Sequence, residues 1–314
     1  MKETADHVQL RPLGFGEIFD RAVTLYVQNF AGFSIIVLFV LVPFSIANYM
    51  FLSASTAANA VILQQVLHPQ PGASAPFPIS PALVWLFIIG ALFTPFANVA
   101  TAIGVARLYA SQAVDWRRCY GAALARWPQI LLALLTQLAI FAGAVFVGSI
   151  VIGVLTTFSV LSFTRNTTFG VAGFIITAAL FLAWLALLLM LYLTSMFAFD
   201  AVGIESLAIG AAVGAAFRRI FNRTEFVKAL LFGLAVLAIQ IGIVVVSAIL
   251  VAVLEAGLKS HLVDTLAQGI VSLISTAFLA ILIAVYYYDV RVRREGLDLQ
   301  ASVEAMTPAA QLPA

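Results

Sequence analysis

Long stretches without any charged side chain constrain this sequence more than any other feature. Each is long enough for one or two helices of about 20 apolar residues, the length that spans the hydrocarbon core of a bilayer. The composition agrees, because 63% of the residues are hydrophobic and 10% are charged, against roughly 45–50% and about 25% in soluble domains. Lipid is therefore the expected solvent. The charge-free stretches lie between Arg21 and Arg107, Arg126 and Arg165, Arg165 and Asp200, Lys228 and Glu255, and Asp264 and Asp289.

The apolar pattern predicts an all-α integral membrane protein with six membrane-spanning helices. A loop is expected over residues 54–81, where five prolines occur, and short turns are expected at Arg165–Asn166 and Glu255–Asp264. The predicted spans are Ala31–Leu52, Ala82–Ala106, Gln129–Leu155, Val171–Phe199, Phe226–Leu254 and Thr265–Tyr288.

The distribution of Lys and Arg near the helix ends predicts the orientation. Fourteen of the sixteen fall on one side of the predicted membrane, and only Arg165 and Lys259 fall on the other. By the positive-inside rule, both termini and the two long connections are expected in the cytoplasm. The fourteen are Lys2, Arg11, Arg21, Arg107, Arg117, Arg118, Arg126, Arg218, Arg219, Arg223, Lys228, Arg291, Arg293 and Arg294.

Three amphipathic segments precede the three predicted helical hairpins: Gly16–Phe30, Trp116–Trp127 and Glu205–Arg223. Each has an apolar face opposite a polar face at helical spacing, which is typical of helices that lie in the headgroup plane. We therefore expect one membrane domain over residues 1–300, built as three pseudo-repeats of an interfacial helix plus a transmembrane hairpin. The expected units are 1–109, 110–200 and 201–290, followed by a flexible tail at 301–314.

Neutral polar residues are the main chemical feature of the predicted spans. They allow two interpretations: a polar path for a lipid headgroup or small solute, or helix–helix packing through small and hydrogen-bonding side chains. Spans without a charged residue argue against ion-coupled transport, which usually needs an ionisable group inside the membrane. The candidate residues are Thr94, Asn98, Thr101, Gln137, Gln240, Gln268 and Ser272.

Metal-binding and nucleophilic groups are sparse. His68, His261 and Asp264 could approach one another on the outer side, but they have no characteristic metal-ligand spacing. Cys119 lies beside Arg117 and Arg118 without an evident base. We expect no metal, no cofactor and no catalytic residue.

Two terminal stretches resemble the opening and closing signatures of the membrane domain of glycerophosphoryl diester phosphodiesterases. The opening stretch reads RPLGFGEIFDR from Arg11 to Arg21 and continues through Leu25–Tyr26 to Asn29–Phe30; the closing stretch, Tyr287–Leu299, reads YYDVRVRREGLDL. Val27 and Gln28 stand where the family has basic residues. Where the two ends meet, we expect Glu17, Asp20 and Arg21 to pair with Asp289, Arg291 or Arg293.

The resemblance, which is to bacterial proteins, implies a module of a bacterial inner membrane without phosphodiesterase activity. In fused members of that family, the reaction belongs to a separate soluble barrel with a metal site of His, Glu and Asp. This sequence has no set of residues that could replace that site, so a standalone, non-enzymatic module is expected.

Three classes of function stay open on these grounds. The first is a non-catalytic scaffold, partner-binding or membrane-organising protein; the second is a lipid-handling protein or uncoupled transporter that uses the neutral polar helix faces. The third is an interfacial enzyme. The expected partners are anionic lipid headgroups at the cytoplasmic face and either a protein partner or a second copy of the chain, with no nucleic acid.

Overall fold

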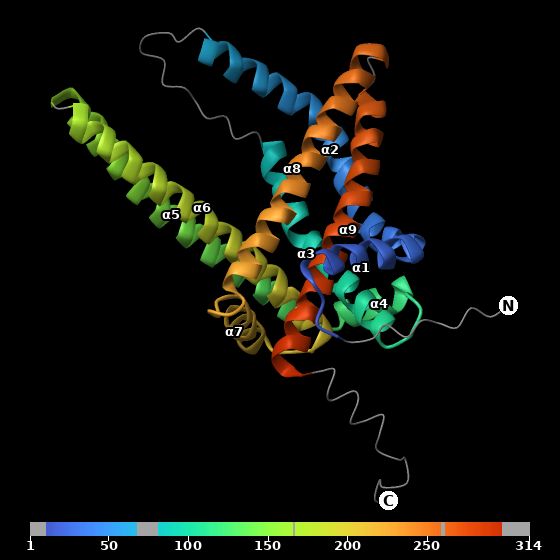
Figure 1. The fold of residues 1–314 in the computed structure, drawn as a ribbon. Coiled ribbons are helices and arrows are strands. Elements are labelled where there is room, and N and C mark those ends of the chain that lie inside the picture. The colour runs from blue at the N-terminus through green and yellow to red at the C-terminus, as the bar shows by residue number, and fades with distance from the viewer. Residues whose placement is uncertain (1–10, 68–80, 166, 259–260, 297–314) are drawn as a thin grey trace, which may run out of the picture. The chain divides into compact units, whose positions relative to one another are not determined.

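The computed structural model is helical throughout its regular structure, and it describes residues 11–67, 81–165, 167–258 and 261–296. Within these ranges, one short helix precedes each of three pairs of long helices (Figure 1). The short helices are α1 Phe15–Gln28, α4 Trp116–Leu124 and α7 Ile209–Ile220. The long helices are α2 Phe30–Leu67, α3 Pro81–Tyr109, α5 Trp127–Arg165, α6 Thr167–Ile204, α8 Phe226–Leu258 and α9 His261–Glu295.

All six long helices are long and apolar enough to cross a membrane. Their most apolar parts have a mean hydropathy between 1.7 and 2.9 and few charged residues, as lipid-facing helices require. The sequence prediction of an all-helical chain with six membrane-crossing segments is confirmed. The short helices coincide with the three amphipathic segments.

Several helix boundaries differ from the sequence prediction. The loop expected from residue 54 starts later, because α2 continues to Leu67; residues 54–67 contain several alanines and no proline, so nothing in them breaks a helix. The turn expected over Glu255–Asp264 is also shorter, since α8 ends at Leu258 and α9 begins at His261. The expected tail, 301–314, lies outside the described residues.

The chain packs as two compact units. Unit 1 comprises Met1–Ala125 and Ile239–Ala314, and unit 2 comprises Arg126–Ala238. This division does not follow the expected pseudo-repeat boundaries, so the threefold repeat stays a prediction.

Unit 1 packs α1, α2 and α3 against α9, with α4 held against α2 and α3. Its core is aromatic: Phe33 on α2 and Tyr286 and Tyr287 on α9 are fully buried, as is Ile18 on α1. The approach of α2 to α3 requires Gly104, since a Cβ there would lie 3.0 Å from the ring of Phe33. The apolar face of α1 is thus part of the core.

Unit 2 is built on the α5–α6 hairpin, and α7 packs against both helices. Contacts join the hairpin from its middle to its tip. The indole Nε1 of Trp184 donates to the carbonyl oxygen of Ala144 at 3.1 Å, and the hydroxyls of Ser159 and Thr177 lie 3.3 Å apart. A Cβ added at Gly148 would lie 2.0 Å from Trp184 Nε1. Glycine at this position therefore sets the spacing of the two helices.

Candidate functional site

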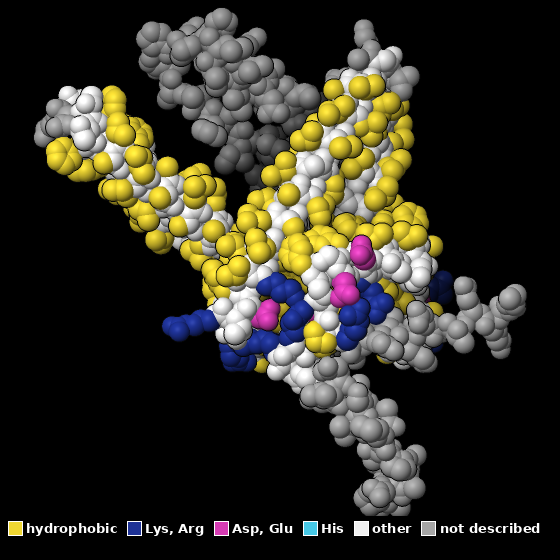
Figure 2. Space-filling view, in the orientation of Figure 1, with side chains coloured by type: hydrophobic (Ala, Val, Ile, Leu, Met, Phe, Trp, Pro, Cys, Tyr) yellow, Lys and Arg dark blue, Asp and Glu magenta, His cyan; other side chains and the backbone are white. Residues whose placement is uncertain are grey.

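Charged side chains gather at one end of the helices in each unit, which we call the charged end. In unit 1 this is the end with α1, α4 and the last turns of α9; in unit 2 it is the end with α7. Figure 2 shows the Lys, Arg, Asp and Glu side chains there, while hydrophobic side chains cover the helix shafts. Among the described residues, Asp264 near the start of α9 is the exception, and the other charged side chains that the structure describes lie at this end.

Helix α4 is docked through its apolar face. Cys119 and Ala123 are fully buried, and the hydroxyl of Tyr120 donates to the carbonyl oxygen of Ile36 at 2.6 Å. The Phe39 ring of α2 lies 5.2 Å from the Tyr120 ring and 6.4 Å from the Trp116 ring. These contacts fix the rotation of α4, so its opposite face is free to meet the surroundings.

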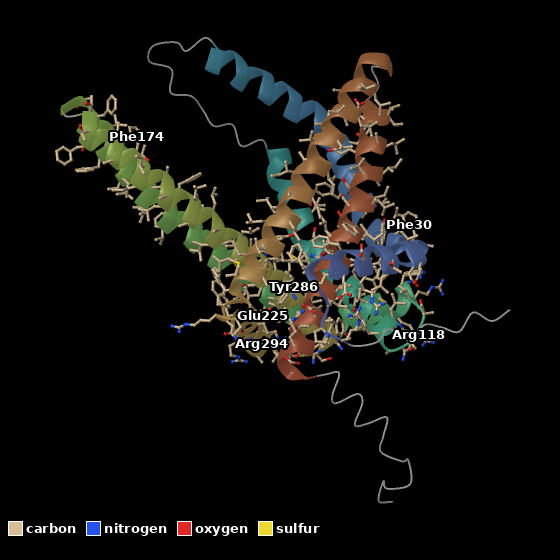
Figure 3. All side chains as sticks on the ribbon, in the orientation of Figure 1. Phe30, Arg118, Phe174, Glu225, Tyr286 and Arg294 are labelled. Atoms are coloured by element: carbon tan, nitrogen blue, oxygen red, sulfur yellow. The ribbon has the colours of Figure 1, made fainter. Side chains whose placement is uncertain are left out.

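The outward face of α4 combines arginines with an aromatic ring. Arg117 and Arg118 are exposed, and Figure 3 shows Arg118 on the outside of the structure. The Arg117 guanidinium lies 5.2 Å from the Trp116 ring centroid, within cation–π range. Asp115 caps the helix by accepting from the backbone N–H of Arg117 at 3.0 Å, and it lies 3.5 Å from Arg118. Two exposed cations thus lie next to a half-buried indole at the edge of the docked face.

The only cysteine of the chain lies on the opposite, buried face of α4. Burial raises the pKa of the Cys119 thiol to about 11, although Arg107 acts in the other direction. The sequence placed Arg117 and Arg118 beside this thiol, yet both arginines are exposed whereas the thiol is fully buried. Cys119 is therefore a structural residue.

Helix α1 begins with a charged cap. The carboxylate of Glu17 accepts from the backbone N–H of Gly14 at 2.7 Å and from Arg11 at 2.8 Å. These two interactions lower the pKa of Glu17, with the Gly14 hydrogen bond as the larger cause. Glu17 thus stabilises the start of α1 and does not contact α9.

The two ends of the sequence meet through Asp289 of α9. Its buried carboxylate accepts from the backbone N–H of Leu13 at 2.7 Å and from Arg293 at 3.1 Å. Arg293 also donates to the carbonyl oxygen of Leu13. We call Leu13, Asp289 and Arg293 the terminal clasp. The clasp joins the opening and closing stretches through the backbone of Leu13. A backbone group is the same in almost every residue, so the pattern of side chains in the sequence does not indicate this contact.

The other terminal signature residues have separate partners. Arg291 pairs with Glu295 at 2.8 Å within α9. Arg21 lies beside Tyr109, whose ring stacks on Tyr288 at 4.4 Å. Among the described residues, the exposed Asp20 carboxylate has no ion pair. The meeting of the two ends was expected, but the pairs of Glu17, Asp20 and Arg21 with the α9 residues do not form.

The charged end of unit 2 contains buried ionisable groups that the sequence pattern did not single out. Arg219 is 7% exposed and makes a bidentate pair with Glu205, at 2.8 and 3.1 Å. Arg126 donates to the carbonyl oxygen of Val202, at 3.0 Å, and to that of Gly203. These carbonyl groups at the end of α6 thereby gain hydrogen-bond partners.

Asp200 lies one turn before the end of α6 and is 4% exposed. Its Oδ2 has no hydrogen-bond partner among the described residues. The sequence placed Asp200 just outside a span ending at Phe199, where water could reach it. The helix continues to Ile204 instead, which places this carboxyl in the interior.

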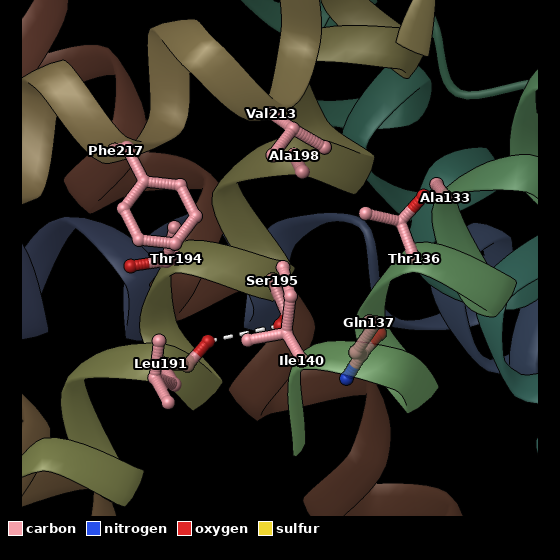
Figure 4. Close-up of a pocket in the computed structure, with 10 residues that line it drawn as sticks. All are labelled: Ala133, Thr136, Gln137, Ile140, Leu191, Thr194, Ser195, Ala198, Val213 and Phe217. Atoms are coloured by element: carbon pink, nitrogen blue, oxygen red, sulfur yellow. Dashed lines mark hydrogen bonds between the residues drawn. The ribbon is translucent and has the colours of Figure 1, made fainter. Parts of the chain in front are cut away.

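A pocket in unit 2 opens between α5, α6 and α7. Its polar wall consists of Gln137 and Thr136 from α5 with Thr194 and Ser195 from α6, and Phe217 of α7 closes one side (Figure 4). The hydroxyls are satisfied locally: Thr136, Thr194 and Ser195 each donate to the carbonyl four residues earlier. The space is about 10 Å³, at the lower limit for one water molecule. The remaining lining residues are Ala133, Ile140, Leu191, Ala198 and Val213.

Of the seven predicted polar residues, Gln137 alone contributes to this pocket. Thr101 is fully buried without a partner for its hydroxyl among the described residues, and Asn98 and Ser272 are half-buried. The other three, Thr94, Gln240 and Gln268, are exposed on helix shafts. The sequence missed the three hydroxyl residues of the pocket wall, although Thr136 adjoins Gln137 and the Thr194–Ser195 pair interrupts an apolar run.

The expected outer His/Asp group is only partly visible. Asp264 is 9% exposed near the start of α9. The side chains of His7, His68 and His261 lie outside the described residues. Among the described residues, no three His, Cys, Asp or Glu side chains are grouped as a metal site would require.

Comparisons with known proteins leave the family open. No family model, no curated protein and no solved structure matches this chain. Any functional assignment therefore depends on the charged ends of the two units and on the pocket beside Gln137.

Proposed function

We propose that this protein is a non-catalytic, membrane-organising protein that gathers anionic lipid at the cytoplasmic face of a bacterial inner membrane. In this proposal the charged end of each unit faces the cytoplasm, with both termini on that side. The observation on which it depends is the first turn of α4, a docked helix on which the exposed Arg117 and Arg118 adjoin the half-buried Trp116 ring. Such an arrangement suits a phosphate headgroup above the acyl boundary.

The charges on α4 support a lipid ligand in preference to a catalytic role. The Asp115 carboxylate beside Arg118 is used as the cap of α4, and the thiol on the same helix is buried with a raised pKa. Each basic residue near an anionic surface contributes on the order of 1 kcal/mol, or about a fivefold local preference. Because Asp115 lies 3.5 Å from Arg118 and offsets one of the two positive charges, α4 is expected to enrich anionic lipid by about the fivefold of one basic residue.

The proposal extends to the arrangement of the chain. The order of one short helix and two long helices, three times over, supports a pseudo-repeat in which α1, α4 and α7 have one role. The terminal signatures support membership in the phosphodiesterase membrane-domain family. A clasp between Leu13 and Asp289 gives these signatures a structural role, because it joins the first and last helices.

Fluorescence quenching in nanodiscs tests the lipid preference. A variant with Trp85, Trp127 and Trp184 replaced by Phe keeps Trp116 as the only indole. With a fixed mixture of phosphatidylglycerol and phosphatidylcholine, bromination of the anionic lipid should quench Trp116 about fivefold more, per mole, than bromination of the zwitterionic lipid.

Two variants separate this proposal from a general charge effect. Arg117→Gln with Arg118→Gln should abolish the preference, and high salt should weaken it. Arg165→Gln, on the opposite side of the proposed topology, should leave it unchanged. Equal quenching by the two lipids in the parent protein would refute the proposal.

The alternative of lipid handling or uncoupled transport makes a different prediction. It requires passage along neutral polar residues, and the pocket beside Gln137 has room for about one water molecule. Labelled lipid or solute should then cross liposomes containing the protein, and Gln137→Leu should slow that crossing. Unchanged flux after this substitution counts against transport.

A further inference from the structure

The α5–α6 hairpin has a much longer apolar length than a bilayer requires. Its two apolar segments, Trp127–Thr164 and Thr167–Ile204, contain 38 residues each. At about 1.5 Å per residue, each extends about 57 Å, whereas the hydrocarbon core is about 30 Å thick. Almost half of an upright hairpin would therefore lie outside the hydrocarbon.

The hairpin cannot shorten itself by bending. Pro128, in the first turn of α5, is the only proline in the two helices, and Gly148–Ser149 is the one Gly–Ser pair at which a sharp kink could form. Figure 1 shows α5 and α6 running side by side without such a kink. The contacts of Trp184 with Ala144 and of Ser159 with Thr177 hold the helices together. Near the tip, the Phe163 and Phe174 rings lie 6.4 Å apart, and Figure 3 shows Phe174 there. The hairpin is a straight, paired rod.

Both ends of this rod are polar, and no charged side chain lies between them along α5. At the near end, Arg126 binds the last carbonyls of α6 and the adjacent Trp127 is 55% exposed, as is typical of an interfacial anchor. The opposite end has the sequence Thr164–Thr168, TRNTT. Along α5, large apolar side chains are about equally exposed over the whole length. They include Leu135 at 60%, Phe146 at 67%, Val154 at 63% and Leu161 at 60%.

We propose that the hairpin crosses the bilayer at a tilt of about 58° from the membrane normal, with lipid chains covering its whole apolar length. This is the angle at which a rod of about 57 Å fits a core of about 30 Å, and it exceeds the usual range of about 0–40°. The tilt places both polar ends at the two membrane surfaces. It also places apolar surface of the rod across the path of neighbouring lipid chains, which must splay around it.

The inference does not depend on lipid recognition by α4. Upright and tilted rods place the four exposed α5 residues at different depths. From the near surface, an upright rod places Leu135 at about 12 Å, Phe146 at about 28 Å, and Val154 and Leu161 beyond the core. A rod tilted by about 58° places Phe146 at the midplane, about 15 Å deep, with Leu161 about 3 Å from the far surface.

Spin labelling of the full chain distinguishes the two. In a Cys119→Ala background, which removes the only cysteine, nitroxides are attached one at a time after substitution to cysteine. The ratio of each label's accessibility to oxygen and to a water-soluble nickel chelate then gives its depth in the liposome membrane. The labelled positions are Leu135→Cys, Phe146→Cys, Val154→Cys and Leu161→Cys, with the exposed loop residue Gln112→Cys as the water reference.

The tilted hairpin predicts the greatest depth at position 146, followed by 154, then 135, then 161. Because all four side chains are already exposed, their replacement removes little packing. Nickel access at positions 154 and 161 equal to that at 112 would overturn the proposal. Protection of these two positions in native membranes but not in liposomes would also overturn it, since a protein partner and not lipid would then cover the shaft.

Discussion

Substitution of one glycine should separate the two helices of the α5–α6 hairpin. In Gly148→Ala, the added Cβ would lie 2.0 Å from Trp184 Nε1 and 2.4 Å from Cε2, against an ordinary contact distance of 3.4–4 Å. The indole or the helix must therefore move by more than 1 Å. That movement also breaks the hydrogen bond from Trp184 to the Ala144 carbonyl, which is 3.1 Å long.

The magnitude follows from two costs and a matched control. Overpacking costs about 1–3 kcal/mol, and an interhelical hydrogen bond in a membrane protein contributes about 0.6–1.7 kcal/mol. Gly143→Ala, five residues earlier in α5, introduces a Cβ with no atom within 4 Å, so it shares the gain in helix propensity without the clash. Gly148→Ala should therefore be less stable than Gly143→Ala by about 2–4 kcal/mol.

The measurement is the free energy of unfolding in mixed micelles. Titration with sodium dodecyl sulfate, followed by the fluorescence of Trp184 with the other tryptophans replaced by Phe, gives the midpoint for each variant. Trp184→Phe should partly restore the stability of Gly148→Ala, because it removes the pyrrole edge of the indole with which the new Cβ clashes. Size-exclusion chromatography after heating measures the fraction of each variant that stays folded. Equal midpoints for the two glycine variants would show that the helices are not paired at this spacing.

Three further predictions concern the charged end. Asp289→Asn should lower the free energy of unfolding by about 2–4 kcal/mol, because the terminal clasp loses a buried charge. The control Asp20→Asn should change the free energy of unfolding by no more than about 0.5 kcal/mol. Unfolding in mixed micelles measures both variants, and similar losses would contradict the clasp. The pKa of Glu17 is lowered in the folded protein, so the stabilisation of the start of α1 is complete above the pKa of the unfolded chain and is lost as the pH falls through the pKa of the folded protein. Hydrogen exchange of the first backbone amides of α1 between pH 6 and 3 should show this loss. The control is Glu17→Gln, which should lack this pH dependence. With its pKa at about 11 instead of 9.0, the Cys119 thiol should react with iodoacetamide at pH 8 at least about 100-fold more slowly than in the unfolded chain; equal rates would mean that α4 is not docked.

The sequence alone determined the class of protein and the number of its long helices. Charge-free stretches leave lipid as the only adequate solvent, and the spacing of apolar residues is a local property that needs no knowledge of contacts. The same holds for α1, α4 and α7, since the face of an amphipathic helix is fixed by residues three and four positions apart. Boundaries were less determined. Helix α2 continues to Leu67 through residues without a proline, and the apolar segments of α5 and α6 extend over 38 residues each, beyond the predicted ends of the spans.

Only the tertiary structure decided how polar groups are used. The terminal clasp depends on the backbone of Leu13, which has the same N–H and carbonyl as almost any other residue and therefore no signature in the sequence. The buried position of Asp200 follows from one additional turn of α6, and the polar wall around Gln137 follows from the packing of α5 against α6. Local patterns specify which side chains leave water, whereas the partners they meet are set by contacts between residues far apart in the chain.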